Sequence, residues 1–375
     1  MIICFECSQL TKRILDEIVS KGQYEDYGEA ITTAIENLGV LHRELTGKGS
    51  LIIESHGKLK QEFIDNVMNA SLKNDLFTLN KNKSKKEEPS IPGLFRLNDF
   101  GKPPHFAPIP EDNWSFAEAI PLNKWIFAMY NRLLPAKVNC RALAHMQNDL
   151  EGSVPYNQIR LEISKIAGIF GDYLRKHDKN AGLNRDDAFA TAFPHTGKGS
   201  DKSMERYLNQ FLGYVNKEGN IESLLYSFKL INYEPSENPK IMLTEAGWKF
   251  ASLENNILDS QNPGNNSKLS SQEIDCLLQH ISHNVPVENY AYTTIIKLIL
   301  NGNDSPSNLD NALKDTVKVE QGTKLTESFL SSQRSGAVSR MSDLDLIKRI
   351  RKGVNINYEL TSRAHKYMEN TDVTS

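Results

Sequence analysis

The sequence has few cysteines, no long apolar run and no strong net charge. Its four cysteines, Cys4, Cys7, Cys140 and Cys276, are spread over 375 residues, which argues against a disulfide framework and for reduced thiols. No run approaches the roughly 20 apolar residues that cross a bilayer. The first residues also lack the basic segment of an export signal, so we expect a cytoplasmic protein without a membrane span.

The basic residues are unevenly distributed. A net charge of -3 disfavours binding to a polyanion, because such binding needs clustered cations. Between Lys324 and Lys366, however, nine lysines and arginines face only four acids. The C-terminal part is therefore locally basic, and the length of the chain indicates two or three domains.

The first residues have the pattern strand, helix, helix. An extended run over residues 2–7 is followed by two amphipathic helices. Elements this small do not bury enough core alone, so we expect the strand to pair with its copy from a second chain. Residues 1–48 resemble the ribbon-helix-helix family, and the resemblance implies a homodimer formed through residues 1–46. Members of that family read DNA with the strand, but here one strand face presents Cys4 and Glu6, so we expect dimerisation rather than base reading.

Polar linkers divide the rest of the chain. Residues 49–90 continue as a helical segment and end in a run of Asn, Lys and Glu that we interpret as a linker. A second linker follows residue 260, and Ser270 and Glu273 behind it have the spacing of a capping box. We therefore expect a middle domain over residues 91–260 and a C-terminal domain over residues 268–370.

The beginning of the middle domain is rich in aromatic residues. Residues 91–135 include Phe95, Phe100, Trp114 and Trp125. We interpret these side chains as filling the underside of the next domain. A docking surface for another protein is the alternative.

Two places further along share a spacing. In both, the end of an apolar helix leads through a polar stretch to a Leu-Thr pair and a final helix. Ile231 precedes Leu243 by 12 positions, and Ile347 precedes Leu360 by 13 positions. We expect a hairpin at each place, with the threonine as the N-cap of the final helix.

Both places resemble the winged-helix family, and the second is the closer match. Residues 333–341 are similar to a recognition helix with Val338 and Met341 toward the core, and residues 348–354 to a basic wing with glycine at its tip. The resemblance implies duplex DNA binding, because Arg and Gln pair with base edges and wing cations suit phosphates or a narrow minor groove. The residues expected to contact DNA are Gln333, Arg334, Ser335, Ser339, Arg340, Lys348, Arg349, Arg351 and Lys352.

Other interpretations of these residues stay open. Arg334 and Arg340 also fit an exposed helix with ordinary surface ion pairs, and the wing cations fit a solvated hairpin. The first copy is a weaker DNA reader, because its wing has two acids and no cation before the second strand. Ahead of it, Lys198, Lys202 and Arg206 are expected either as secondary DNA contacts or as packing and partner-binding residues.

Several patterns that look chemical have simpler explanations. Cys4 and Cys7 form a C-x-x-C without a second pair, so strand-face thiols are expected rather than zinc ligands. Cys276 and His280 stand four residues apart with no further ligands near them in sequence, and two T-G-K-G-S sequences lack the spacing of a phosphate loop. No nucleophile pairs with a base, so we expect no cofactor, no metal and no enzymatic activity.

The expected fold is mainly α with small β elements, built from the ribbon-helix-helix-like unit and two winged-helix-like domains. We expect a non-catalytic dimer that binds duplex DNA. It would act as a transcriptional regulator or, by analogy of architecture, as the DNA-targeting accessory subunit of an antiviral defence or mobile-element system that delivers a partner enzyme. The main alternative is a scaffold whose winged helices bind partner proteins, and the third is an enzyme with an unrecognised metal site.

Overall fold

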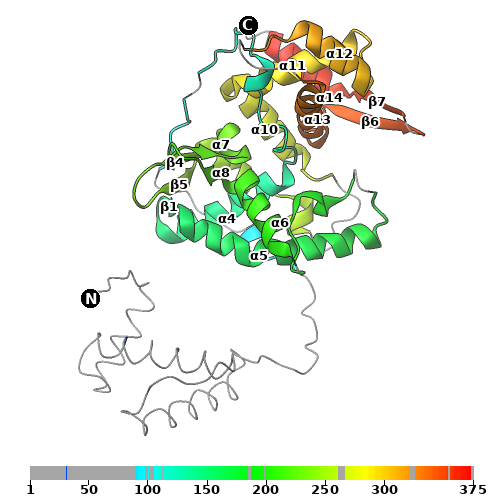
Figure 1. Ribbon diagram of the computed structural model, residues 1–375. Coiled ribbons are helices and arrows are strands. Elements are labelled where there is room, and N and C mark those ends of the chain that lie inside the picture. Colours follow the sequence, from blue (N-terminus) through cyan, green and yellow to red (C-terminus); the bar gives the residue numbers. More distant parts are fainter. Residues whose placement is uncertain are drawn as a thin grey trace, which may run out of the picture. The chain divides into compact units, whose positions relative to one another are not determined.

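The structure is a computed structural model that describes residue 31 and residues 90–372 with short gaps (Figure 1). The gaps are residues 98–99, 101–104, 112, 185–186, 198, 261–266, 321–325 and 354, and the side chains of Lys352 and Asp372 are also not described. The ribbon-helix-helix-like unit expected over residues 1–48, with Cys4 and Cys7, and the segment that follows it lie outside the described residues. From residue 90 onward the described chain belongs to one unit.

The described residues are mainly helical, with small antiparallel sheets, as the sequence predicts. None of their helices joins the length to the apolar character that crossing a membrane requires. Short 3-10 turns, η1 (Gly93–Phe95) and η2 (Leu122–Lys124), precede the first long helix.

Helix α4 (Leu134–Leu150) forms the centre of the first half. Pro135 suits its first turn, which needs no N–H there, and Glu151 in the left-handed conformation (φ 53°) ends it. Nearly all of its residues up to Gln147 are buried. The elements around it are β1 (Val154–Pro155), α5 (Tyr156–Asn180), η3 (Phe189–Ala192), α6 (Ser200–Tyr207), the π-helical turn η4 (Leu208–Leu212), β2 (Tyr214–Val215), β3 (Ile221–Glu222), α7 (Leu224–Ser227), β4 (Ile231–Glu234), β5 (Lys240–Leu243), α8 (Glu245–Ser252) and α9 (Asn256–Asp259).

One sheet of the first half joins segments distant in sequence. Strand β5 lies between β1 and β4, and both pairs are antiparallel. Strand β1 stands between α4 and α5 along the chain, so its pairing with β5 holds these helices against the β4–β5 hairpin. A second pair, β2 and β3, forms a small hairpin beside η4.

The second half begins with the capping box that the sequence predicts. Ser270 accepts the backbone N–H of Glu273, and the Glu273 carboxylate accepts the N–H of Ser270. The helices and strands that follow are α10 (Ser271–Asn284), α11 (Pro286–Leu300), α12 (Pro306–Thr316), α13 (Glu327–Asp343), β6 (Ile347–Lys352), β7 (Asn355–Leu360) and α14 (Ser362–Asp372). Figure 1 shows the β6–β7 hairpin projecting beside α13.

The two hairpins confirm the repeated spacing. Ile231 of β4 pairs with Leu243 of β5, and Ile347 of β6 pairs with Leu360 of β7. The second hairpin has strands of six residues, against four in the first. Gly353, with φ of 63°, occupies its turn, where a left-handed residue is needed.

Each hairpin also closes in the same way. The threonine after the second strand caps the next helix, since the side chains of Thr244 and Thr361 each accept a backbone N–H three residues on. The same hydroxyls donate to the carbonyls of Lys229 and Asp345, at 2.8 and 2.5 Å. Lys229 and Asp345 both have positive φ, 53° and 52°. The predicted threonine caps are therefore confirmed, and the two closures share one hydrogen-bond pattern.

Buried charged side chains join the two halves. Lys137 of α4 forms an ion pair with Glu273 of α10 at 2.8 Å, and both side chains are fully buried. One turn along α4, and within the first half, Arg141 donates two hydrogen bonds of 2.6 Å to the carboxylate of Asp259 of α9. Burial lowers the pKa of Lys137 to about 8, although the charge of Glu273 opposes this shift. Replacing either Lys137 or Glu273 would leave the other charge buried and alone, so the contact between the halves depends on both partners of this pair.

The aromatic-rich segment 91–135 packs against both halves. Phe95 is buried edge-on against Phe170 of α5, with 5.3 Å between ring centroids. Trp125 is buried edge-on against Tyr290 of α11, with 6.5 Å between centroids. The prediction that aromatic side chains here fill the underside of a domain is confirmed for these two residues.

Candidate nucleic-acid interface

Helix α13 carries the residues predicted to read base edges, but its arginines point into the protein. Arg340 is fully buried and forms two hydrogen bonds to the carboxylate of Glu288, at 2.5 and 2.9 Å. It also donates to the backbone carbonyl of Tyr130 at 3.0 Å. The prediction that Arg340 faces outward is therefore wrong, whereas the prediction that Val338 and Met341 face the core is confirmed.

Arg334 and Gln333 are also turned inward. Arg334 is 7% exposed and donates to both carboxylate oxygens of Asp310 at 2.9 Å and to the hydroxyl of Tyr358 at 3.0 Å. Gln333 is 4% exposed and donates to the carbonyl of Leu122 at 3.5 Å. Their predicted outward orientation is wrong, because the half-buried carboxylate of Asp310, the hydroxyl of Tyr358 and the carbonyl of Leu122 supply partners that the local sequence does not show.

The face of α13 that remains accessible carries small hydroxyl side chains. Ser335 is exposed, as predicted, and Ser342 is half-buried. Ser339 is only 5% exposed, which contradicts its predicted outward position, although it stands on the same face at helical spacing. Next to this face, Gly336 lets the helix approach the backbone at Ala128, because a Cβ on Gly336 would lie 2.6 Å from the Ala128 carbonyl oxygen.

The β6–β7 hairpin presents its cations beside this serine face. Lys348 and Arg351 are exposed on β6, and Arg349 is half-buried. The guanidinium of Arg349 donates to the hydroxyl of Ser339 at 2.7 Å, which positions it against α13. The predicted wing is thus a hairpin with cations on its first strand, and the side chain of Lys352 is outside the described residues.

A cleft of about 1220 Å³ lies between the hairpin, the serine face of α13 and the first half of the chain. Its walls come from the loop before α4, from the segment η3–α6–η4, and from α13 and β6. Among the described residues, the charged groups lining it are Arg132, Arg206, Asp187, Asp345, Lys348, Arg349 and Arg351. Five cations against two carboxylates give the lining of the cleft an excess of positive charge, and the serine hydroxyls on α13 add hydrogen-bond donors to it.

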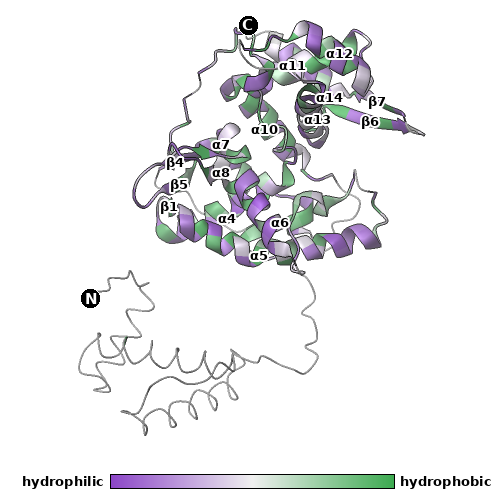
Figure 2. Cartoon of the chain, viewed as in Figure 1, coloured by the Kyte–Doolittle hydropathy of each residue, from purple (hydrophilic) through white to green (hydrophobic). Residues whose placement is uncertain are grey.

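Of the three residues predicted as secondary DNA contacts, Lys198, Lys202 and Arg206, the structure describes the last two. Arg206, at the end of α6, is exposed and lines the cleft. Lys202 is exposed on the same helix but does not line the cleft, and Lys198 lies outside the described residues. Figure 2 shows α6 as largely hydrophilic. Of the two that the structure describes, Arg206 therefore lines the cleft with the cations of the second half, and Lys202 does not.

One cation of the cleft was not among the predicted residues. Arg132 precedes α4, and its guanidinium lies 3.8 Å from the carboxylate of Asp343 at the end of α13. The backbone N–H of Leu133 also donates to Asp343, at 3.0 Å. The signal in the sequence is weak: a polar Asn-Arg pair just before an apolar helix start.

The residues that resemble chemical sites have structural partners. Cys276 and His280 are both buried on α10, where burial raises the pKa of the thiol and lowers that of the imidazole. Nε2 of His280 lies 2.8 Å from the carbonyl of Phe228, and the side-chain amide of Asn284 lies 3.2 Å from Nδ1. No group of three potential metal ligands occurs among the residues that the structure describes.

Comparisons with protein-family models, with curated protein sequences and with solved structures found no match to this chain.

Proposed function

We propose that the protein binds duplex DNA, without catalysing a reaction, by receiving the sugar-phosphate backbone of one strand in the cleft. The supporting observation is that Arg132, Arg206, Lys348, Arg349 and Arg351, from three separate segments, line one cleft beside a helix face of serines. Phosphates are held by such cations and hydroxyls, and small side chains let the backbone approach closely.

We assign a winged-helix architecture to both halves. In the first half, a strand between two helices pairs with the second strand of a hairpin, as the β1–β5–β4 sheet does. In the second half, α11, α12 and α13 lead into the β6–β7 hairpin, which would be the wing. Because Arg334 and Arg340 are buried, we assign DNA selectivity to the shape and deformability of the duplex rather than to base reading by these residues.

The wider role is part of the same proposal. Dimerisation through residues 1–46, inferred from the sequence pattern alone, would place two clefts on one DNA molecule. Two linked sites bind with greater avidity than one. Such a dimer would act as a transcriptional regulator or as the DNA-targeting accessory subunit of a defence or mobile-element system.

The test is a salt titration of binding to a short fluorescent duplex, measured by anisotropy. The affinity of the unchanged protein should fall steeply with salt, and Arg351→Ala should lower the slope of log K against log salt by about 0.9, the value for one phosphate contact. Lys165→Ala is the matched control, since Lys165 is exposed on α5, pairs with Glu162 in the same helix, and does not line the cleft.

Four outcomes count against the proposal. Three of them are affinity independent of salt, equal loss in the control and in Arg351→Ala, and divalent-dependent cleavage of the duplex. The first would favour a protein-binding scaffold, and the last would favour a nuclease. Tighter binding to the single strand than to the duplex would also overturn the assignment.

A further inference from the structure

A second cavity, of about 660 Å³, shares a wall with the cleft. The wall is the loop that leads into α4, where Phe127 and Tyr130 line the cavity. Met129 and Arg132 of the same loop line the cleft. Gln210 of η4 lines both. The cavity and the cleft are therefore neighbours, separated by this loop.

Aromatic rings in contact with water form part of the cavity. Phe127 is 56% exposed and Tyr214 is 47% exposed, although both line a concave surface. The half-buried ring of Tyr226 lines the same cavity. The other apolar residues of the lining are Pro110, Trp125, Ile126, Ile221, Val285 and Val287. Such a lining favours a flat ligand that covers the exposed rings, because aromatic rings stack on one another.

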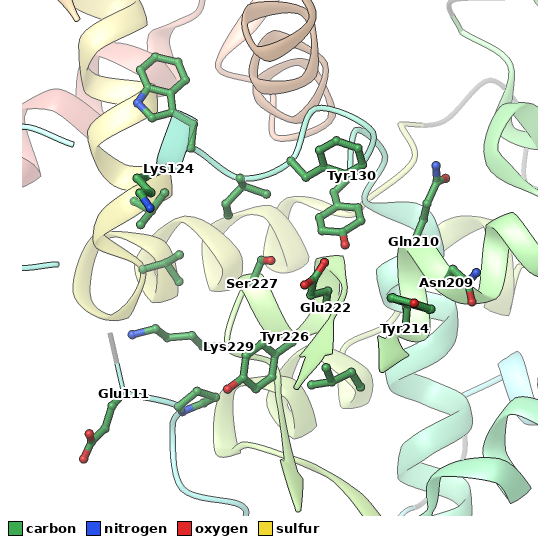
Figure 3. Close-up of a pocket in the computed structure, with 17 residues that line it drawn as sticks. Glu111, Lys124, Tyr130, Asn209, Gln210, Tyr214, Glu222, Tyr226, Ser227 and Lys229 are labelled. Atoms are coloured by element: carbon green, nitrogen blue, oxygen red, sulfur yellow. The ribbon is translucent and has the colours of Figure 1, made fainter. Parts of the chain in front are cut away.

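The lysines of the lining already have partners. Nζ of Lys124 lies 3.0 Å from the carboxylate of Glu320, which is outside the cavity. Lys229 is 8% exposed and has a contact of its own. Figure 3 shows Glu111 on the same side as the two lysines, so neither sign of charge prevails there. A ligand suited to this lining is uncharged.

The polar groups on the other side are an amide, a hydroxyl and a hydrogen-bonded carboxylate. Figure 3 shows Gln210, Tyr130 and Glu222 on the side away from the lysines. The carboxylate of Glu222 accepts the side-chain amide of Asn216 at 2.9 Å. Burial, together with the charge of Glu222, raises the pKa of Tyr130 to about 12, so its hydroxyl stays protonated. The side-chain amide of Gln210 carries donors and an acceptor, which complement the edge of a nucleobase.

A nucleobase that is part of a strand meets these requirements. It is flat and uncharged, and its edges carry hydrogen-bond donors and acceptors. Its phosphate belongs to the backbone, which the cleft would hold, so no anionic group has to enter the cavity. The volume of about 660 Å³ lies within the roughly 300–1,000 Å³ of small-molecule sites. Proteins that receive a base in this way take it out of the stack and cover it with aromatic or apolar side chains.

We propose that the cavity receives one unpaired base of the DNA whose backbone lies in the cleft. The base stacks against Phe127 and Tyr214, and the amide of Gln210 binds its edge. This inference rests on the proposed function, because the cleft brings the strand to the loop. It also gives the selectivity for duplex deformability a source, since a base that is already unpaired costs least to extrude.

The experiment measures, by anisotropy, the affinity of the full chain for three fluorescent duplexes of one sequence. One is fully paired, the second carries an extra adenine as a bulge, and the third carries an abasic residue in place of that adenine. The abasic bulge keeps the flexible backbone and lacks the ring. The adenine bulge should bind about tenfold more tightly than either of the others, or by about 1.4 kcal/mol, a gain that stacking of one base on aromatic side chains supplies.

Substitutions at the exposed ring test the cavity itself. Phe127→Ala should reduce the preference for the adenine bulge to about twofold or less, whereas Phe127→Tyr keeps the ring and should keep the preference. Phe116→Ala is the matched control, because Phe116 is 46% exposed and lines neither the cavity nor the cleft. Arg351→Ala should weaken all three duplexes by the same factor, since Arg351 lines the cleft and not the cavity.

Three results would overturn this inference alone. They are equal affinity for the adenine bulge and the paired duplex, equal affinity for the two bulges, and an unchanged preference in Phe127→Ala. The second would assign the preference to a flexible backbone instead of a captured base. If none of the three duplexes binds with salt-dependent affinity, the proposed function fails and this inference fails with it. The two failures are distinguishable, because the paired duplex still binds when only the inference about the base is wrong.

Discussion

Arg340 and Arg351 belong to one helix–hairpin unit, and replacing each by methionine should have opposite consequences. Arg340 is fully buried against Glu288, which is also fully buried. Arg340→Met leaves that carboxylate buried without its partner, a change that costs about 3–5 kcal/mol. A typical domain is stable by only about 5–15 kcal/mol, so the variant should be strongly destabilised.

Arg351→Met should instead keep the stability of the fold and lose affinity for the duplex. Its side chain is exposed on β6, and exposed substitutions usually change stability by less than about 0.5 kcal/mol. If the proposed function holds, this variant should lose duplex affinity and its salt slope should fall by about 0.9. The pair thus separates a structural arginine from a DNA-contacting one with the same chemical change.

The measurements are urea unfolding followed by circular dichroism and duplex anisotropy on the same samples. If Arg340→Met does not fold, the double variant Arg340→Met with Glu288→Met restores a neutral pair and should recover most of the lost stability. Its duplex affinity should then lie within about threefold of the unchanged protein, a difference under 1 kcal/mol. A stable Arg340→Met that fails to bind duplex would refute the structural role assigned to this arginine.

Two further substitutions test the burial of His280 beside Phe228 and the position of α13. Because burial lowers the pKa of His280 below its unfolded value near 6.5, the unfolded state takes up the proton first and stability should fall as pH drops through 6.5. Urea unfolding should show a loss of at most about 1.4 kcal/mol per pH unit that His280→Asn lacks, and equal losses in both proteins would contradict the assignment. Gly336→Ala should destabilise the fold by about 1–3 kcal/mol, because its Cβ would lie 2.6 Å from the carbonyl oxygen of Ala128. Gly353→Asn at the exposed turn is the comparison, since asparagine tolerates the left-handed conformation, and an equal effect of both changes would contradict the close packing of α13.

The features that the sequence predicted correctly depend on neighbours along the chain. The hairpin that pairs Ile347 with Leu360, the threonine caps and the capping box at Ser270 all use hydrogen bonds between residues a few positions apart, or a turn that selects glycine. These elements depend on local geometry, so residue type and spacing are enough to place them.

The orientation of α13 could not be read in this way. The partners of Arg334 and Arg340, Asp310 and Glu288, are 24 and 52 residues away in sequence. Without these carboxylates, the arginines, glutamine and serines of this helix are all expected to face water, as the sequence alone predicts. The ion pairs with Glu288 and Asp310 turn the two arginines inward instead. The same holds for Arg132, whose place in the cleft depends on contacts with the end of α13, 211 residues later at Asp343.

Arg340 does not line the cleft, but it helps to position the loop that carries Arg132, which does. Arg340 donates to the carbonyl of Tyr130, two residues before Arg132, and Asp343 one turn later on α13 accepts the N–H of Leu133. These bonds attach the loop of the first half to the helix of the second, so the cation of one half is held opposite the hairpin cations of the other. A helix with Arg340 outward would lose the first of these bonds and keep the second. Arg340 and Asp343 therefore share the attachment of the loop, and for this reason we expect the double replacement of Arg340 and Glu288 to change duplex affinity by no more than about threefold.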